Sequence, residues 1–150
     1  MLAVIMIEQT QAKRNKLINI VIFAIFFALA YLGVQQFSGG SDSPEDVLPP
    51  LAEELNSKTP FMVDEFIRAD SASTKGNSFT YYYTITNAQK NDIDEAMVVN
   101  TVKPLMIEEI RTNEDMALYK KLKTTIVYSY YDANGESFTN ITISPDDYLE

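Results

Sequence analysis

The 150-residue sequence contains neither cysteine nor histidine. Without cysteine no disulfide can form, so the fold has to be held by its hydrophobic core alone. Without histidine the chain lacks the commonest general base, the commonest zinc ligand and every Ser-His or Cys-His nucleophile. The enzymatic alternative that we consider for this chain is therefore one based on carboxylates.

The paired carboxylates in the sequence do not form an acid/base couple. Glu53 and Glu54 are adjacent, as are Glu108 and Glu109. Adjacent residues of a helix point in different directions, so neither pair suits a reaction such as sugar cleavage. We predict no catalytic residues, no cofactor and no enzymatic activity, with a carboxylate-based hydrolase as the alternative.

The segment Asp132–Glu136, DANGE, places oxygen side chains at alternate positions, as a calcium loop does. A calcium loop of the EF-hand type needs glycine at its sixth position and glutamate at its twelfth. Ser137 and Ile143 occupy those positions here. The segment is therefore interpreted as a hairpin turn, and no metal site is predicted.

A long uncharged run dominates the N-terminal part of the sequence. It extends from Leu17 to Phe37, 21 residues, and as a helix it would cover roughly 30 Å, the thickness of a bilayer core. Lys13, Arg14 and Lys16 precede it. The positive-inside rule then keeps the N-terminus in the cytoplasm and exports the rest of the chain.

A cleaved signal peptide is the alternative interpretation of the same run. Ala28-Leu29-Ala30 has the small-x-small form of a cleavage site, but the apolar run continues past it, from Tyr31 to Val34. The uncleaved anchor is the favoured reading. Whether translation starts at Met1 or Met6 stays open.

Four regions follow from this interpretation. They are a cytoplasmic N-terminus at 1–16, a transmembrane signal-anchor helix at 17–37, a flexible tether at 38–46 and one extracytoplasmic α+β domain at 47–150. The predicted location is the bacterial inner membrane, with residues 17–37 in the lipid bilayer and the C-terminal domain in the periplasm or outside the cell.

The exported part is strongly acidic. Residues 38–150 contain 20 acidic and 9 basic side chains, a net charge of −11. Such a charge repels phosphate backbones, so no nucleic-acid partner is expected. A protein partner with a basic surface would complement it.

Residue patterns in the domain predict alternating helices and hairpins. A helix at 43–58 is expected to be broken by Pro49-Pro50, and Asn91 is expected to cap a core helix at 92–112. Strands are predicted at 65–73 and 78–86, and a second hairpin at 124–144 with a type I′ turn at Asn134-Gly135. The order helix, hairpin, helix, hairpin predicts an α+β fold with a four-stranded antiparallel sheet and helices on one face.

The core helix at 92–112 carries apolar residues at helical spacing. Those expected to face the core are Ile93, Met97, Val99, Val102, Leu105, Met106 and Ile110.

Three segments carry a resemblance to known sequences: LNSKTPFMVDEFIRAD, YYYTIT and VYSYYDANGESFTNITISPDD, which together span Leu55 to Asp147. In these segments the chain resembles a group of uncharacterised short bacterial membrane-anchored proteins with a small α+β extracytoplasmic domain. The resemblance implies a location and a fold, and it supplies no catalytic residues.

Tyrosine is the most distinctive residue of the domain. Strand alternation assigns Tyr81, Tyr83, Tyr128 and Tyr130 to the core, and Tyr82 and Tyr131 to the opposite face of the sheet. Tyrosine is enriched at binding hot spots, so Tyr82 and Tyr131, ringed by acids, are predicted to bind a protein. The alternative is a sheet stabilised by cross-strand aromatic pairs, with one face in water.

Taken together, the sequence predicts a single-pass, membrane-anchored protein-binding or accessory module, as a small subunit of an inner-membrane assembly. A periplasmic immunity or exclusion factor that neutralises an incoming protein is the second hypothesis.

Overall fold

The computed structural model describes residues 43–149, with the exception of residue 64. Within this part of the chain, no helix is long and apolar enough to cross a membrane. The predicted span at 17–37 lies outside the described residues, as do Lys13, Arg14 and Lys16.

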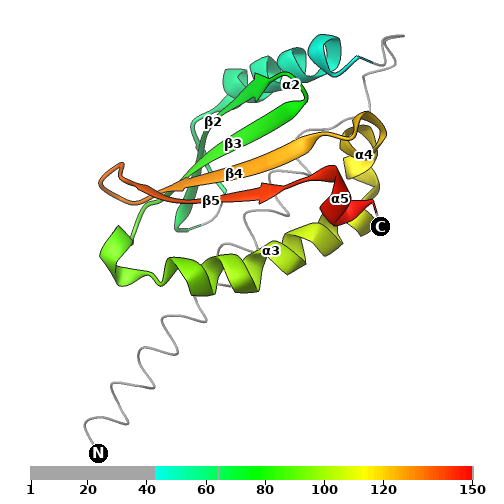
Figure 1. Cartoon of the computed structure of the whole chain (residues 1–150). Coiled ribbons are helices and arrows are strands. Elements are labelled where there is room, and N and C mark those ends of the chain that lie inside the picture. The colour runs from blue at the N-terminus through cyan, green and yellow to red at the C-terminus, as the bar shows by residue number, and fades with distance from the viewer. Residues whose placement is uncertain (1–42, 64, 150) are drawn as a thin grey trace, which may run out of the picture.

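The described chain folds into a small α+β domain, in which helices pack on a single sheet (Figure 1). In chain order the main elements are α2 (Pro44–Lys58), β1 (Phe61–Met62), β2 (Ile67–Lys75), β3 (Ser78–Ile85), α3 (Glu95–Thr112), α4 (Ala117–Leu122), β4 (Thr125–Tyr131), β5 (Ser137–Ile143) and α5 (Pro145–Tyr148). Short 3-10 turns at Lys90–Asp92 and Glu114–Met116 precede α3 and α4.

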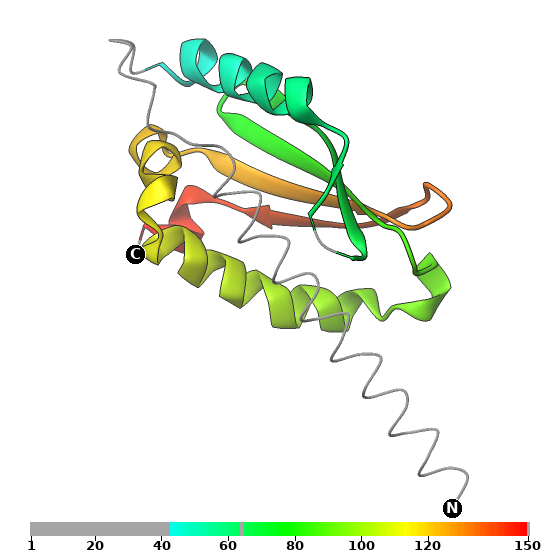
Figure 2. The same ribbon diagram turned by 180° about the vertical axis from the view of Figure 1, so that it is seen from behind.

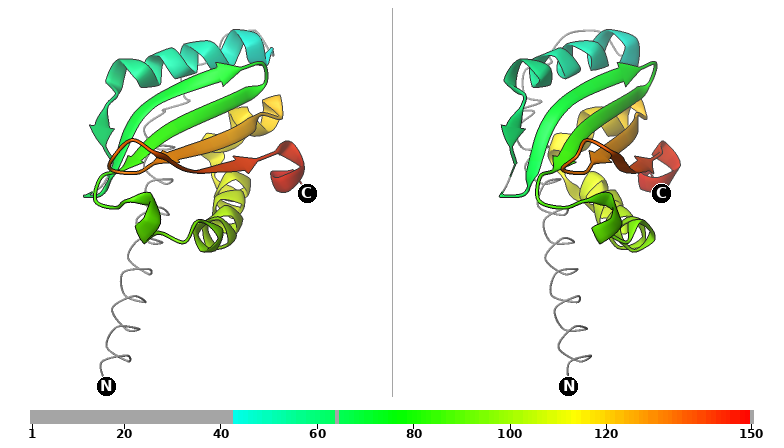
Figure 3. Two further views of the ribbon diagram at one scale, coloured as in Figure 1. Left: turned by 60° about the vertical axis from the view of Figure 1, so that its left-hand side comes forward. Right: turned by 90° about the vertical axis from the view of Figure 1, so that its left-hand side faces the viewer.

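The sheet has five strands in the order β1-β2-β3-β4-β5 and is mixed (Figure 3). The pairs β1–β2, β2–β3 and β4–β5 are antiparallel, whereas β3 and β4 run parallel. The α+β class and the two hairpins are therefore confirmed. The predicted four-stranded antiparallel sheet is wrong, because β1 adds a strand and the two hairpins join in parallel.

The parallel junction follows from the long connection between the hairpins. Two strands can run antiparallel through a short turn, but parallel neighbours need a crossover, usually a helix. Here the chain leaves β3 at Ile85, forms α3 and α4, and enters β4 at Thr125. The crossover returns the chain to the end of the sheet at which β3 began, so Ser78 pairs with Thr125 and Tyr81 with Tyr128.

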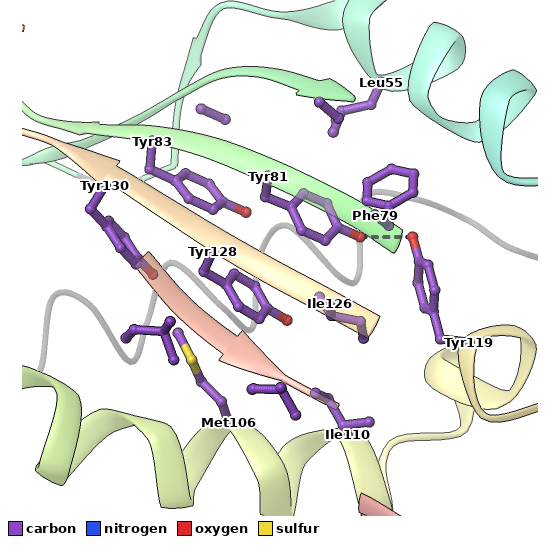
Figure 4. Close-up of a cluster of buried hydrophobic side chains, with 14 of the residues drawn as sticks. Leu55, Phe79, Tyr81, Tyr83, Met106, Ile110, Tyr119, Ile126, Tyr128 and Tyr130 are labelled. Atoms are coloured by element: carbon purple, nitrogen blue, oxygen red, sulfur yellow. Dashed lines mark hydrogen bonds between the residues drawn. The ribbon is translucent and has the colours of Figure 1, made fainter. Parts of the chain in front are cut away.

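The helices α2 and α3 lie near opposite edges of the sheet, α2 next to β2 and α3 next to β5 (Figure 2). Side chains from both helices, such as Leu55 of α2 and Met106 of α3, point at the same sheet face (Figure 4). The prediction that helices cover one face is therefore correct.

Helix α2 is continuous, contrary to the predicted break at Pro49 and Pro50. The two prolines lack an N–H and so cannot donate to the carbonyls four residues before them, those of Glu45 and Asp46. Both residues are exposed and lie in the first turn, where water can replace the bonds. The buried residues before and after the prolines share one core-facing side: Val47, Leu48, Leu51, Ala52 and Leu55.

Helix α3 starts later than predicted. Its N-cap is Asp94, whose carboxylate accepts a hydrogen bond from the Met97 N–H, rather than Asn91. The buried stripe consists of Val98, Val102, Met106 and Ile110. Leu105 was expected in the core but is 46% exposed. The sheet covers only one side of the helix, so part of the apolar surface of α3 stays in solvent.

The centre of the core is a cluster of tyrosine rings on β3 and β4 (Figure 4). Because Tyr81 pairs with Tyr128 and Tyr83 with Tyr130, their rings stack across the parallel junction, with centroids 5.5 Å apart in both pairs. The Tyr81 hydroxyl bonds to the Tyr119 hydroxyl of α4 over 2.9 Å. Burial raises the pKa of all five phenols above the usual value.

Three of these tyrosines keep a buried hydroxyl without a hydrogen-bond partner among the described residues: Tyr83, Tyr128 and Tyr130. A buried hydroxyl of this kind costs free energy, because it has left water without replacing the hydrogen bonds it made there. These rings contribute through their apolar area and their stacking rather than through their oxygens.

The β4–β5 hairpin is closed by Asp132, which is 1% exposed. Its Oδ1 accepts from the Asn134 and Glu136 N–H groups at 2.8 and 2.9 Å, and its Oδ2 accepts from the Lys90 N–H at 3.0 Å. These hydrogen bonds, the one from Lys90 foremost, lower the pKa of the Asp132 carboxyl. The interpretation of this segment as a turn is consistent with that role, since the carboxylate ties the turn to the segment before α3.

The turn itself is not of type I′. A type I′ turn needs positive φ at both central residues. Gly135 has φ +82°, but Lys123 is the one non-glycine residue with positive φ in the described ranges, so Asn134 does not qualify. The Gly135 N–H instead donates to the Asp132 carbonyl over 3.0 Å, which makes the loop longer than predicted.

Removing single hydroxyls from the tyrosine cluster should separate packing from hydrogen bonding. We expect Tyr128→Phe to leave the free energy of unfolding within about 1 kcal/mol or to raise it, since the lost oxygen has no partner. Tyr81→Phe should lower it by about 1 to 3 kcal/mol, because the Tyr119 hydroxyl is then buried unpaired. Tyr128→Ala should cost about 3 to 5 kcal/mol. Urea unfolding followed by circular dichroism measures all three, and a loss in Tyr128→Phe as large as in Tyr81→Phe would contradict this assignment.

Acid should destabilise the domain in part through Asp132. Its folded pKa lies below the unfolded value of about 3.9, so its contribution is complete above that value and disappears as the pH falls through the folded pKa. Asp132→Asn should lower stability at pH 7, because its amide N–H₂ would face the Lys90 N–H, and should flatten the acid limb of the stability curve. Thermal melts between pH 7 and pH 2.5 check this. Asp146→Asn, at an exposed carboxylate, is the control and should keep the acid limb of the unmodified protein.

Candidate protein-binding face

Among the described residues, no helix covers the sheet face opposite α2 and α3, although Thr84 and Ser129 on it are buried by their neighbours. The observed strand register places on it Arg68, Ser71 and Ser73 of β2, Thr80, Tyr82 and Thr84 of β3, Val127, Ser129 and Tyr131 of β4, and Asn140 and Thr142 of β5. Hydroxyl-bearing side chains make up most of this set. We call these residues the open sheet face.

Tyr82 and Tyr131 lie next to each other at the centre of the open sheet face, as the sequence predicted. They come from neighbouring strands, and their ring centroids are 6.4 Å apart at an interplanar angle of 37°. Both side chains are half-buried. The Tyr82 hydroxyl also bonds to the Ser73 hydroxyl over 3.0 Å, which orients its ring. The two rings therefore form a fixed pair with one side available to solvent.

The residues around this pair are mostly uncharged, with Asp70 as the one nearby acid in the strands, so the predicted ring of acids is not formed by the described residues. Strands β3, β4 and β5 contain no charged residue, and among the five strands β2 alone carries charges, at Arg68, Asp70 and Lys75. A sequence pattern does not give the register between strands, so it could not show where the acids of the domain lie relative to the two tyrosines. In the fold, these acids lie on helices and loops instead.

One charged cluster borders the tyrosine pair and was not foreseen. A bulge in β2 between Ala69 and Ser71 turns Asp70 onto the open sheet face. Its carboxylate accepts hydrogen bonds from Arg68 and from the Thr84 hydroxyl. The negative charge of Asp70 is balanced by the positive charge of Arg68, so the open sheet face stays close to neutral. In the sequence, Arg68 and Asp70 are two residues apart in a strand, which is the spacing of side chains on one face. The bulge keeps both on the open sheet face while shifting the residues that follow.

A second feature is a shallow hollow on α3. Its lining includes Val99, Pro104, Ile107 and Arg111 of α3 together with Asp147 of α5. The Arg111 guanidinium donates to the Asp147 carbonyl over 2.8 Å.

Asp147 is held in place at this hollow. The pKa of its carboxyl is lowered, chiefly by hydrogen bonds from Ser144 and further by the nearby Lys103 ammonium, 3.6 Å away. These contacts are those of a structural cap on the last helix. Within residues 43–149, residue 64 left aside, no group of three or more acidic side chains is placed to hold a metal ion.

Three solved structures share this fold at low sequence identity. A Pseudomonas aeruginosa protein thought to be secreted has a TM-score of 0.59 at 13% identity, and the match covers 73% of this chain and 98% of that one. AspS, the type II secretion system pilotin of Vibrio cholerae, has a TM-score of 0.52 at 12% identity, with 69% and 91% covered. EpsS, the pilotin of the Vibrio vulnificus type 2 secretion system, has 0.53 at 10%, with 73% and 96% covered.

At identities this low the likeness concerns the fold, and it carries no residue-level role to this chain. No curated protein is detectably similar to the chain in sequence. A family model does match it, over residues 44–139, which is most of the domain and includes both tyrosines of the central pair. The chain therefore belongs to the family of the domain of unknown function DUF8479.

Proposed function

We propose that this domain is a small protein-binding module that works outside the cytoplasm as an accessory to a larger protein assembly, and that it holds its partner with the open sheet face. The observation that carries the proposal is the Tyr82–Tyr131 pair: two half-buried rings side by side, with their contact geometry already fixed.

The chemistry of the open sheet face suits protein recognition. Tyrosine offers a large contact area at a small entropic cost, and serine, threonine and asparagine supply adaptable hydrogen bonds. Removing a charged side chain from water is a large free-energy cost of forming an interface. The open sheet face carries no charged side chain apart from Arg68 and Asp70, which already pair with each other. A partner would therefore desolvate mainly hydroxyls and two aromatic rings, and the acidic remainder of the domain would favour a partner with basic residues at the rim.

The comparisons support the accessory part of the proposal. Two of the proteins with this fold are pilotins of type II secretion systems, and a third is thought to be secreted. An extracytoplasmic location also agrees with the resemblance to anchored bacterial proteins seen in the sequence. The proposal assigns no enzymatic activity: the chain has no histidine or cysteine, and the carboxylate of Asp132 is engaged by backbone N–H groups.

Truncating the exposed rings should weaken partner binding more than folding. In full-length protein, Tyr131→Ala and Tyr82→Ala should each lower the free energy of unfolding by about 1 kcal/mol, as expected for loss of a cross-strand pair. The recovery of the partner should fall by at least about tenfold, as for a hot-spot residue. Quantitative co-purification from the native host, with thermal melts of the same samples, measures both effects.

Tyr131→Phe is the matched control, since it keeps the ring and removes only the hydroxyl. It should recover the partner nearly as well as the unmodified protein. Glu53→Ala, on the exposed side of α2, should have no effect on recovery. If Glu53→Ala reduces recovery as strongly as Tyr131→Ala does, the partner binds elsewhere and the proposed face is wrong.

A further inference from the structure

The two edges of the sheet are treated differently. The β2 edge is covered twice: β1 pairs with Ala69 and Arg68, and the Asn56 side chain of α2 bonds to both main-chain groups of Ala72. Its Oδ1 accepts from the Ala72 N–H at 2.7 Å, and its Nδ2 donates to the Ala72 carbonyl at 2.9 Å. One amide thus does what a neighbouring strand would do at that residue.

The β5 edge has no such cover. The Thr125 N–H donates to the Asn77 carbonyl, so the main-chain groups of Thr125 point toward β3. Main-chain groups alternate in direction along a strand, so those of Val127, Ser129 and Tyr131 point toward β3 as well. The main-chain groups of Ile126, Tyr128 and Tyr130 point toward β5, where they pair with those of Ile143, Ile141 and Thr139. The main-chain groups of Asn140 and Thr142 must then point away from the sheet. Both residues have exposed side chains, and within the described chain their outward N–H and C=O groups have no partner.

The composition of β5 does not discourage pairing. Natural edge strands are commonly blunted by lysine, proline or inward-pointing charge, because an open edge accepts further strands. The seven residues of β5, SFTNITI, contain no charge and no proline and are rich in β-branched residues. A bulge near Tyr131 leaves the stretch from Thr139 to Ile143 in regular register.

Acidic residues lie at both ends of this edge. Exposed Glu136 precedes β5 and exposed Asp146 follows it, whereas the neighbouring Asp147 carboxylate is already engaged by Ser144 and Lys103. A second copy of the chain would bring two strongly acidic domains together along this edge, since residues 38–150 have a net charge of −11. A segment with lysine or arginine at its ends would instead complement both acidic ends.

From these observations we propose that β5 accepts an extended segment of another protein as a sixth strand, with β-branched residues at its centre and basic residues at its ends. The Asn140 and Thr142 main chains donate to it and accept from it, in the manner of strand addition. Alternate side chains of the added strand point toward the helix layer. There the hollow lined by Val99 and Ile107 lies on α3, the helix that packs against β5. This surface is separate from the Tyr82–Tyr131 pair.

A defined peptide tests the proposal on the full-length protein in detergent micelles. The probe is a short synthetic peptide in which threonine alternates with valine between terminal lysines. Amide hydrogen exchange, measured by NMR, should slow by roughly tenfold or more at Asn140 and Thr142 on saturation with the peptide. The amides of Thr139, Ile141 and Ile143 should change little, since the β4 ladder already protects them.

Two controls isolate main-chain pairing. The same peptide with N-methyl groups on alternate residues cannot form the ladder and should not slow exchange. Asn140→Pro removes an N–H that β4 does not use, so it should fold and lose the peptide, whereas Asn140→Ser should keep it. Tyr82→Ala should also keep it, which separates a failure of this proposal from a failure of the proposed sheet-face function.

Three results would overturn the inference. One is unchanged exchange at Asn140 and Thr142 with saturating peptide. Another is slowing that the N-methylated peptide produces equally. The third is protection of the same amides without peptide that rises with protein concentration, which would assign the edge to a second copy of the chain.

Discussion

The stacking of tyrosine rings across the parallel junction of β3 and β4 is the constraint on which the rest of the domain depends. Tyr81 stacks on Tyr128 and Tyr83 on Tyr130, at the one place where the two hairpins meet. These fully buried rings are among the largest side chains of the core, and they supply much of the apolar area that a chain without disulfides needs. Because strand residues alternate, the same register directs Tyr82 to the other face.

The surface that results divides into two parts with different chemistry. The acids lie on the helices and loops, whereas the open sheet face and the β5 edge are almost free of charge. The domain can thus be soluble through its acidic periphery and still offer neutral surfaces on which binding costs little desolvation. Pilotins with 10% and 12% identity share the fold, so the fold tolerates nearly complete replacement of its sequence. A fold shared at such identities carries no function to this chain by itself.

Local signals in the sequence predicted much of this. Two-residue periodicity assigned Tyr81, Tyr83, Tyr128 and Tyr130 to the core and the Tyr82–Tyr131 pair to the opposite face, because alternation is a property of each strand alone. Helical spacing located α2 and α3 for the same reason, although the predicted cap of α3, Asn91, lies three residues before the observed cap, Asp94. These signals failed where long-range packing prevailed: α2 continues through its two prolines because its apolar residues before and after them bury on the same side.

The sequence by itself determined which tyrosines of β3 and β4 share a face, the absence of histidine and cysteine chemistry, and the acidic charge. Only the tertiary structure decided that the hairpins join in parallel, since direction depends on how the α3–α4 crossover returns to the sheet. It also decided that Asn56 covers the β2 edge while Asn140 lies on an uncovered one. Both are asparagines in polar surroundings. They differ because Asn56 meets the main chain of Ala72, which is 16 residues away in the sequence, whereas Asn140 meets no such segment among the described residues. A local sequence pattern does not encode such a contact.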